Sequence, residues 1–168
     1  MNEHRWIEES RVTVVVRAVR SGVRHLTVVH SLHSPAADSI DLTAPCGPAP
    51  AVRFLPEVDC VAADIPLGRA LARNETAVIE YTLRSVCDGG VSHQHERRVS
   101  APLQAYLLHM RFHPRALPST CRRTYRRQPG TEPEYRDRVP LDAARTAHLM
   151  PAKCPPDVHG LEWEWPKE

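Results

Sequence analysis

Apolar and polar side chains alternate at every second position through much of the first two-thirds of the chain. Near the start, Val12, Val14 and Val16 lie on one side of an extended backbone, and Thr13 and Arg17 lie on the other. β-Branched residues favour strands because their side chains pack well on a pleated surface. A period of two residues separates the side chains onto the two faces of a sheet. The pattern therefore predicts a β-strand with one buried face and one solvent face.

Two later stretches repeat the same period. Ile79 and Tyr81 share one face of residues 77–84, and Met110 lies on the apolar face of residues 103–112. Further short candidates are separated by turns rich in glycine and proline, at intervals of about 8–12 residues, which is typical of an all-β chain. We predict an antiparallel β-sandwich of immunoglobulin or fibronectin type with about seven or eight strands.

The composition changes after residue 113. Nine of the sixteen prolines lie in residues 114–168, and proline cannot donate a backbone hydrogen bond to a sheet. The expected organisation is a lead-in at 1–10, a β-sandwich domain at 11–113, and an extended Pro/Arg-rich tail at 114–168 that is partly docked on the domain.

Turn and capping residues predict two local elements. The Ser21-Gly22 turn joins two apolar stretches, so that residues 11–31 predict a β-hairpin. Residues 141–150 predict a short helix, because Asp142 lies near its start and Pro151 follows its end.

Net charge and cysteine content indicate which partners and which cellular compartment to expect. The formal net charge is +2, so no global field attracts nucleic acid or an acidic membrane. No apolar run reaches the length of about 18 residues that a membrane-spanning helix needs, and we expect no membrane association. The odd number of scattered cysteines, without a Cys-x-x-Cys pair, favours reduced thiols in the cytoplasm. They are Cys46, Cys60, Cys87, Cys121 and Cys154.

His93 and His95 are the best candidates for a metal site. Side chains two residues apart on a strand point the same way, and Cys87 precedes them across a glycine turn. Imidazole and thiolate ligands in this arrangement suit zinc. The alternative is a solvated strand face, because Gln94 and Glu96 interleave with the histidines. We expect no cofactor and keep zinc as the alternative.

An arginine-rich run is the best candidate for partner binding. Guanidinium groups bind carboxylates and phosphates bidentately, and a tyrosine ring offers a stacking face for an unpaired base. The run predicts an acidic protein partner first and nucleic acid second, with a solvated tail as the remaining alternative. Its members are Arg111, Arg115, Arg122, Arg123, Tyr125, Arg126 and Arg127.

Cys121 is the candidate for the most reactive thiol. Arg122 and Arg123 follow it directly, and neighbouring cations lower the pKa of a thiol. His109 and His113 precede it, which makes a Cys/His-dependent enzyme a hypothesis. Because the sequence has no recognisable oxyanion site or glycine-rich nucleophile turn, we assign no catalytic residue and expect no enzyme.

Three stretches resemble a β-rich region that follows helix-turn-helix modules in actinobacterial transcriptional regulators. They are Arg-Ala-Val-Arg-Ser-Gly-Val at 17–23, Leu-Gly-Arg-Ala-Leu-Ala-Arg-Asn-Glu-Thr-Ala-Val-Ile-Glu-Tyr at 67–81, and Arg-Phe-His-Pro-Arg-Ala-Leu-Pro at 111–118. The resemblance covers roughly residues 5–128, and no helix-turn-helix module precedes them. It implies an accessory, sensing or dimerising unit and transfers no functional residue.

Together these observations favour a non-enzymatic interaction or regulatory module that binds a protein partner. The resemblance implies a helix-turn-helix regulator or a second copy of the chain as that partner. The alternatives are a β-domain that senses a small ligand or zinc, and a Cys/His-dependent enzyme.

Overall fold

The computed structural model of the chain describes residues 1–31, 39–45, 47–58, 60–86, 90–99, 103, 105–128, 131–151 and 154–167. These residues form an all-β protein with four antiparallel sheets and a single 3₁₀ turn, η1, at Pro56–Val58. Among them, no helix has the length and apolar character needed to cross a lipid bilayer. The all-β prediction is therefore confirmed.

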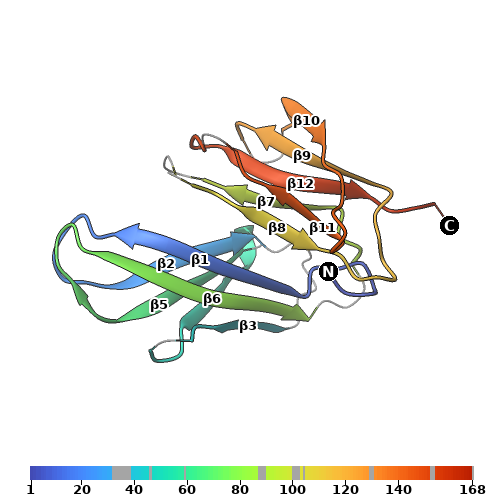
Figure 1. Ribbon diagram of the computed structural model, residues 1–168. Helices are drawn as coiled ribbons and strands as arrows, with labels where there is room; N and C mark the ends of the chain where they lie inside the picture. The colour runs from blue at the N-terminus through green and yellow to red at the C-terminus, as the bar shows by residue number, and fades with distance from the viewer. Residues whose placement is uncertain are drawn as a thin grey trace. The chain divides into compact units, whose positions relative to one another are not determined.

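The chain divides into two compact units (Figure 1). The N-terminal unit is Ile7–Gly90, and the C-terminal unit is Met1–Trp6 with Val91–Glu168. The expected organisation had a single domain at 11–113, whereas the observed division falls between residues 90 and 91. Local alternation predicts strands but does not reveal which strands share a core.

Two three-stranded antiparallel sheets make up the N-terminal unit. The first has the order β1 (Glu9–Arg17), β6 (Thr76–Val86) and β3 (Ser39–Thr43). The second has the order β2 (Val23–Ser31), β5 (Cys60–Leu71) and β4 (Ala51–Leu55).

Both sheets of the N-terminal unit contribute one face to a common core. Val28 and Ile65 from the second sheet cluster with Leu42, Ile79 and Tyr81 from the first. Ile79 and Tyr81 occupy the inward positions that the period of two predicts for β6. Burial of such apolar surface is the main favourable term in folding.

The predicted hairpin at 11–31 is wrong. β1 pairs with β6 over its whole length, and β2 pairs with β5 in the other sheet. The turn at Ser21 and Gly22 exists, with Gly22 at a φ of +84°, but it carries the chain from one sheet to the other. Turn residues predict where the chain changes direction. Which strand pairs with β1 depends on which faces are buried together in the core.

The C-terminal unit combines a four-stranded and a two-stranded antiparallel sheet. The larger has the order β10 (Tyr135–Arg138), β9 (Thr120–Arg126), β12 (Val158–Glu164) and β7 (Gln94–Arg98). The smaller pairs β11 (Thr146–Leu149) with β8 (Leu108–Arg111).

Aromatic rings form the centre of the C-terminal unit. Phe112 meets Trp163 and Trp165 edge-on, with ring centroids 5.6 and 6.2 Å apart. Both indole N–H groups donate to the carbonyl of Ser92, at 2.7 and 3.0 Å. Leu161 is fully buried beside Trp163 on β12. These contacts anchor the last strand of the chain within the unit.

The predicted helix at 141–150 is wrong, and the region expected as a tail contains four strands, β9 to β12. Asp142 stabilises a turn instead of a helix start. Its carboxylate accepts hydrogen bonds from the backbone N–H and the hydroxyl of Thr146, at 2.9 and 2.5 Å. Arg145 adopts a φ of +62° within this turn. The prolines thus separate short strands, which pair across long stretches of sequence.

Candidate interaction surface

The predicted zinc ligands are only partly within the described residues. Cys87 lies outside them. His93 is exposed just before β7, and its carbonyl accepts a hydrogen bond from Trp163 N at 2.8 Å. His95 is half-buried on β7. The described part of the chain has no group of three or more His, Cys, Asp or Glu side chains placed to hold a metal ion. Zinc binding at His93 and His95 stays a prediction.

The arginine-rich run is spread over the C-terminal unit and is largely neutralised by ion pairs. Arg111 and Arg115 have exposed side chains at the end of β8 and beyond it. Tyr125 donates its hydroxyl proton to Asp157 at 2.6 Å, and this bond is the first cause of the raised pKa of the tyrosine. The ion pairs are Arg115–Glu3, Arg122–Glu164 at 2.6 Å, Arg123–Asp137 at 2.7 Å, Arg126–Glu96 at 2.7 Å and Arg127–Glu134 at 3.1 Å.

Arg126 differs from the rest of the run because it is enclosed. Its side chain is 10% exposed, and that of its partner Glu96 is 16% exposed. A second guanidinium nitrogen donates to the carbonyl of Thr131. An arginine enclosed in this way is not available to a partner.

The expected low pKa of Cys121 is wrong. Burial raises the pKa of this thiol to about 11, and the residue is 3% exposed. Neighbours along a strand point to opposite faces, so Cys121 faces the core while Arg122 pairs with Glu164 at 2.6 Å. A thiol that is buried and protonated at neutral pH is a poor nucleophile.

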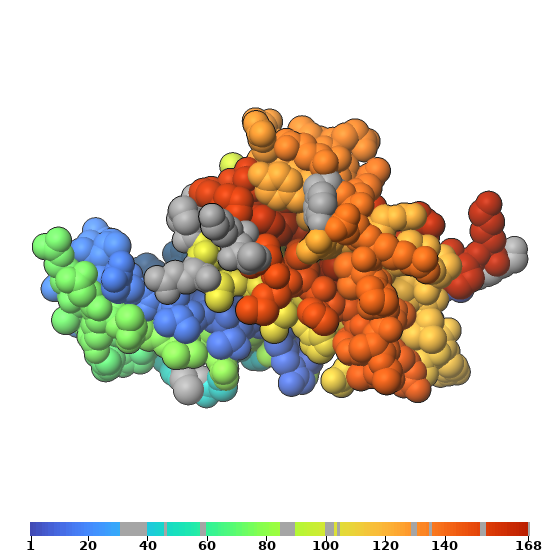
Figure 2. Space-filling model, turned by 45° about the horizontal axis from the view of Figure 1, so that its top comes forward, coloured from blue at the N-terminus to red at the C-terminus, as the bar shows by residue number. Residues whose placement is uncertain are grey.

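A different group of arginines lies at one end of the N-terminal unit, which we call the arginine tip. Two connections meet there: residues 18–22 between β1 and β2, and residues 72–75 between β5 and β6. Their backbones are hydrogen-bonded to each other. Asn74 N donates to Ala18 O at 2.7 Å, and Ala18 N donates to Glu75 O at 2.9 Å. The two connections lie together at the left of Figure 1 and of Figure 2, in blue and green.

Five arginines lie on or next to the two connections of the arginine tip, against one acidic residue. Glu75 is the acidic residue in these stretches, and its carboxylate pairs with Arg69 and accepts the backbone N–H of Ala72 at 2.8 Å. The hydrogen bond from Arg69 is the first cause of the lowered pKa of Glu75. Val19 is 82% exposed at the end of the tip. The arginines are Arg17, Arg20, Arg24, Arg69 and Arg73.

The arginine tip has a fixed backbone. Gly22 and Asn74 occupy the left-handed region, with φ of +84° and +67°, which glycine and asparagine adopt most readily. Gly22 N donates to Leu71 O at 2.9 Å, and Arg73 N donates to the hydroxyl of Ser21 at 3.1 Å. Such hydrogen bonds fix the backbone of the two connections before a partner arrives, which lowers the entropy cost of ordering this backbone on binding.

Charge is unevenly distributed along the N-terminal unit. Outside residues 16–24 and 68–77, the sequence of the unit has nine Asp and Glu residues against three Arg residues. β1 and β5 run toward the arginine tip, and Glu9 lies at the opposite end of β1. The arginine tip is therefore the basic end of a unit that is otherwise acidic.

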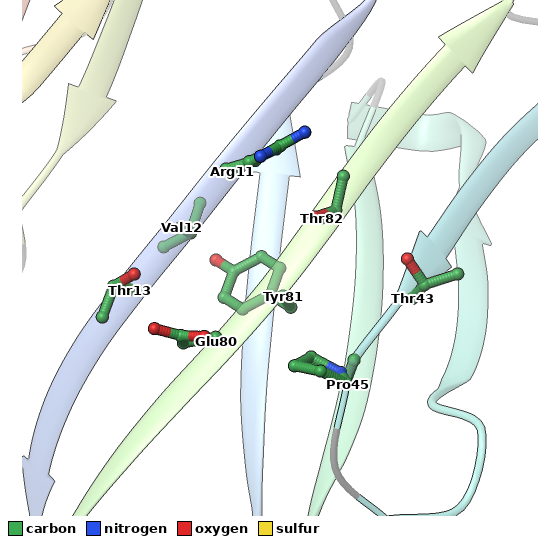
Figure 3. Close-up of a pocket in the computed structure, with 9 residues that line it drawn as sticks. Arg11, Val12, Thr13, Thr43, Pro45, Glu80, Tyr81 and Thr82 are labelled. Atoms are coloured by element: carbon green, nitrogen blue, oxygen red, sulfur yellow. The ribbon is translucent and has the colours of Figure 1, made fainter.

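A hollow on the N-terminal unit is lined by both polar and apolar side chains, and Figure 3 shows them. They come from β1, β6 and the end of β3. Among the described residues, this lining has no histidine or cysteine. The lining residues are Arg11, Val12, Thr13, Thr43, Ala44, Pro45, Glu80, Tyr81 and Thr82.

Sequence reasoning missed the arginine tip because its two halves are far apart in the chain. Arg17 and Arg73 belong to strands and turns that only the fold brings together. The resemblance was the one sequence feature that pointed to the tip, since its stretches at 17–23 and 67–81 contain the two connections. Comparison of the chain with protein-family models, with curated proteins and with solved structures found no match.

Proposed function

We propose that this protein is a non-enzymatic interaction module whose arginine tip binds an acidic surface of another protein. One observation carries the proposal. Arg17, Arg20, Arg24 and Arg73 have exposed side chains on or next to two connections whose backbones are fixed to each other by hydrogen bonds, and Val19 is exposed on one of these connections. None of the four forms an ion pair with a described residue.

The chemistry of arginine suits a carboxylate-bearing partner. A guanidinium fork donates two parallel hydrogen bonds to a carboxylate. Each exposed ion pair contributes only about 0.2–1 kcal/mol, so a useful surface needs several of them together with an apolar contact. Val19, 82% exposed, supplies an apolar contact on the same connection as Arg20.

An acidic protein fits the tip better than a nucleic acid does. The stretches 17–24 and 69–76 have no aromatic side chain, so no ring is present to stack on a base. A long phosphate backbone that leaves the tip along the unit also meets the acidic remainder described above. A compact acidic patch on a protein avoids this repulsion.

The resemblance to the regulator-associated β-region supports a regulatory role as part of the same proposal. Two of its three stretches form the arginine tip, and a helix-turn-helix regulator is then the partner class. Cytoplasmic location is part of the proposal too, and the buried free thiols of Cys121 and Cys154 fit a reducing compartment.

We infer that the N-terminal unit is a β-sandwich of the broad immunoglobulin or fibronectin kind. Two antiparallel sheets that bury a common face support this inference, since that arrangement is the basis of such sandwiches. In sandwiches of this kind the loops gather at the two ends, which is where the arginine tip lies.

Binding of a short polyglutamate peptide to the full chain, followed by fluorescence anisotropy at low salt, tests the proposal. The Arg20→Glu/Arg73→Glu variant should weaken binding at least about tenfold, equivalent to 1.4 kcal/mol. The control is Arg98→Glu/Arg138→Glu, which changes the net charge equally at exposed arginines of the C-terminal unit.

Retention of peptide binding by the control, with loss in the tip variant, supports the proposal. Equal loss in both variants means that binding follows net charge alone and overturns it. An oligonucleotide of equal charge is the second probe, and a clear preference of the tip for the oligonucleotide also overturns it.

A further inference from the structure

β1 is a long strand with one unpaired edge. It has nine residues, Glu9–Arg17, and all of them pair with β6 on one side. No strand of the described residues pairs with its other side. Natural proteins protect such edges with charges, proline or short length. The middle of β1, from Val12 to Val16, has none of these protections.

Apolar surface on both faces of β1 is left uncovered. On the inner face Val12, Val14 and Val16 are only half-buried, whereas Tyr81, the partner of Val12 on β6, is 1% exposed. On the outer face Val15 is 72% exposed. A strand added to the free edge would cover this apolar surface, which favours association.

We propose that a second copy of this chain occupies the edge, with the two β1 strands antiparallel and Thr13 opposite Thr13 of the second copy. This arrangement has two-fold symmetry, so each copy contributes the same surface. It places Glu9 opposite Arg17 of the other copy at both ends. It also places Val12 opposite Val14, which makes a continuous inner face.

The charges of β1 select this register. Centring the pair on Val14 sets Arg11 opposite Arg17, and like charges directly opposite each other are destabilising. Centring it on Val12 leaves Val16 and Arg17 without partners. A shift by one residue brings inward side chains opposite outward ones, which the sheet does not allow. The register centred on Thr13 pairs all nine residues of β1.

Glu9 places a negative charge at one end of β1. Its carboxylate lies 2.9 Å from Arg84 and 2.6 Å from Arg11. The hydrogen bond from Arg84 is the first cause of its lowered pKa, so the group is ionised at neutral pH. Arg17 at the other end of β1 is exposed and has the opposite charge.

Disulfide trapping tests the register. In the Thr13→Cys variant of the full chain, the two cysteines are direct cross-strand neighbours, with Cβ atoms about 4.5–5.5 Å apart. Val15→Cys is the matched control, because the two Val15 residues would be four positions apart along the strand, about 13 Å. Mild oxidation should yield a cross-linked dimer for Thr13→Cys and only the wild-type background for Val15→Cys. Equal cross-linking of both, or none of Thr13→Cys, overturns the proposal.

Sedimentation equilibrium tests the association itself. Arg17→Glu sets like charges opposite each other at both ends and should weaken dimerisation at least about tenfold, the change that 1.4 kcal/mol produces. Arg98→Glu, which makes the same charge change at an exposed arginine of the C-terminal unit, is the control and should leave dimerisation unchanged. A wild-type protein that stays monomeric at all concentrations overturns self-pairing. Since polyglutamate binding is measured separately, that result leaves the proposed function of the arginine tip standing.

Discussion

Replacing Glu96 by Gln removes the charged partner of Arg126 inside the four-stranded sheet. The two side chains are 16% and 10% exposed, and their closest N and O atoms lie 2.7 Å apart. Breaking a buried ion pair leaves one charge without compensation and costs about 3–5 kcal/mol. The Nε atom of Arg126 is already buried without a hydrogen-bond partner among the described residues. We expect a loss of about 3 kcal/mol in the free energy of unfolding.

Glu164→Gln is the matched comparison. Its partner Arg122 lies on β9 as Arg126 does, and the N–O distance of 2.6 Å is similar, but the side chains are 35% and 60% exposed. An exposed pair contributes at most about 1 kcal/mol. The two variants remove the same charge from the same sheet, so their difference isolates the effect of burial.

Urea unfolding followed by tryptophan fluorescence measures this difference. All three tryptophans, Trp6, Trp163 and Trp165, belong to the C-terminal unit, so the signal reports that unit. With a slope of about 1–1.5 kcal/mol per M, a loss of 3 kcal/mol lowers the midpoint by about 2–3 M urea. Equal midpoints for Glu96→Gln and Glu164→Gln would refute the reasoning.

Three further predictions concern the C-terminal unit. Gly160→Ala should destabilise it by about 1–3 kcal/mol in the same assay, because an added Cβ would lie 2.6 Å from the carbonyl oxygen of His95; an unchanged midpoint contradicts this. Cys121 should react slowly with a thiol reagent at neutral pH and rapidly in urea, since burial raises its pKa to about 11; fast labelling of the folded protein would show that the thiol is accessible. Burial also raises the pKa of Tyr106 to about 12, so the folded state keeps the phenol protonated and loses stability as the pH rises from about 10 to 12. Tyr106→Phe should reduce that alkaline loss, and an identical pH profile for this variant would rule out the contribution of Tyr106.

Strand formation was the most predictable part of the fold. Val12, Val14 and Val16 of β1 lie on the inner face that the period of two requires, as do Ile79 and Tyr81 of β6. Local side-chain alternation is sufficient here because it decides both the strand and its buried face. Met110 on β8 is buried as well, although the strand begins only at Leu108.

Strand pairing and the division into units could not be read from local patterns. β1 pairs with β6 instead of β2, and the choice depends on which sheets bury a common face. The prolines after residue 113 predicted a tail, yet β12 lies between β9 and β7 in a sheet. Proline limits pairing at its own position, and short strands between prolines remain free to pair.

For the candidate site too, the sequence revealed local clusters of charge but not the residues that the fold brings next to them. The run at 111–127 stands out in the sequence, but its carboxylate partners, such as Glu96 and Glu164, come from distant strands. The arginine tip combines residues around positions 20 and 73, neither of which is conspicuous alone. Electrostatic surfaces depend on the three-dimensional neighbours of each charge, and sequence spacing does not supply them.

The most direct test of the arginine tip is a residue-by-residue map of where an acidic peptide binds. Backbone amide chemical shifts of the isotope-labelled full chain, followed during titration with a polyglutamate peptide, provide that map. Our account predicts that the shifts change most at residues 17–24 and 69–76, with Val19 and Arg20 among the largest. Changes concentrated at residues 111–127, or spread evenly over both units, would contradict it.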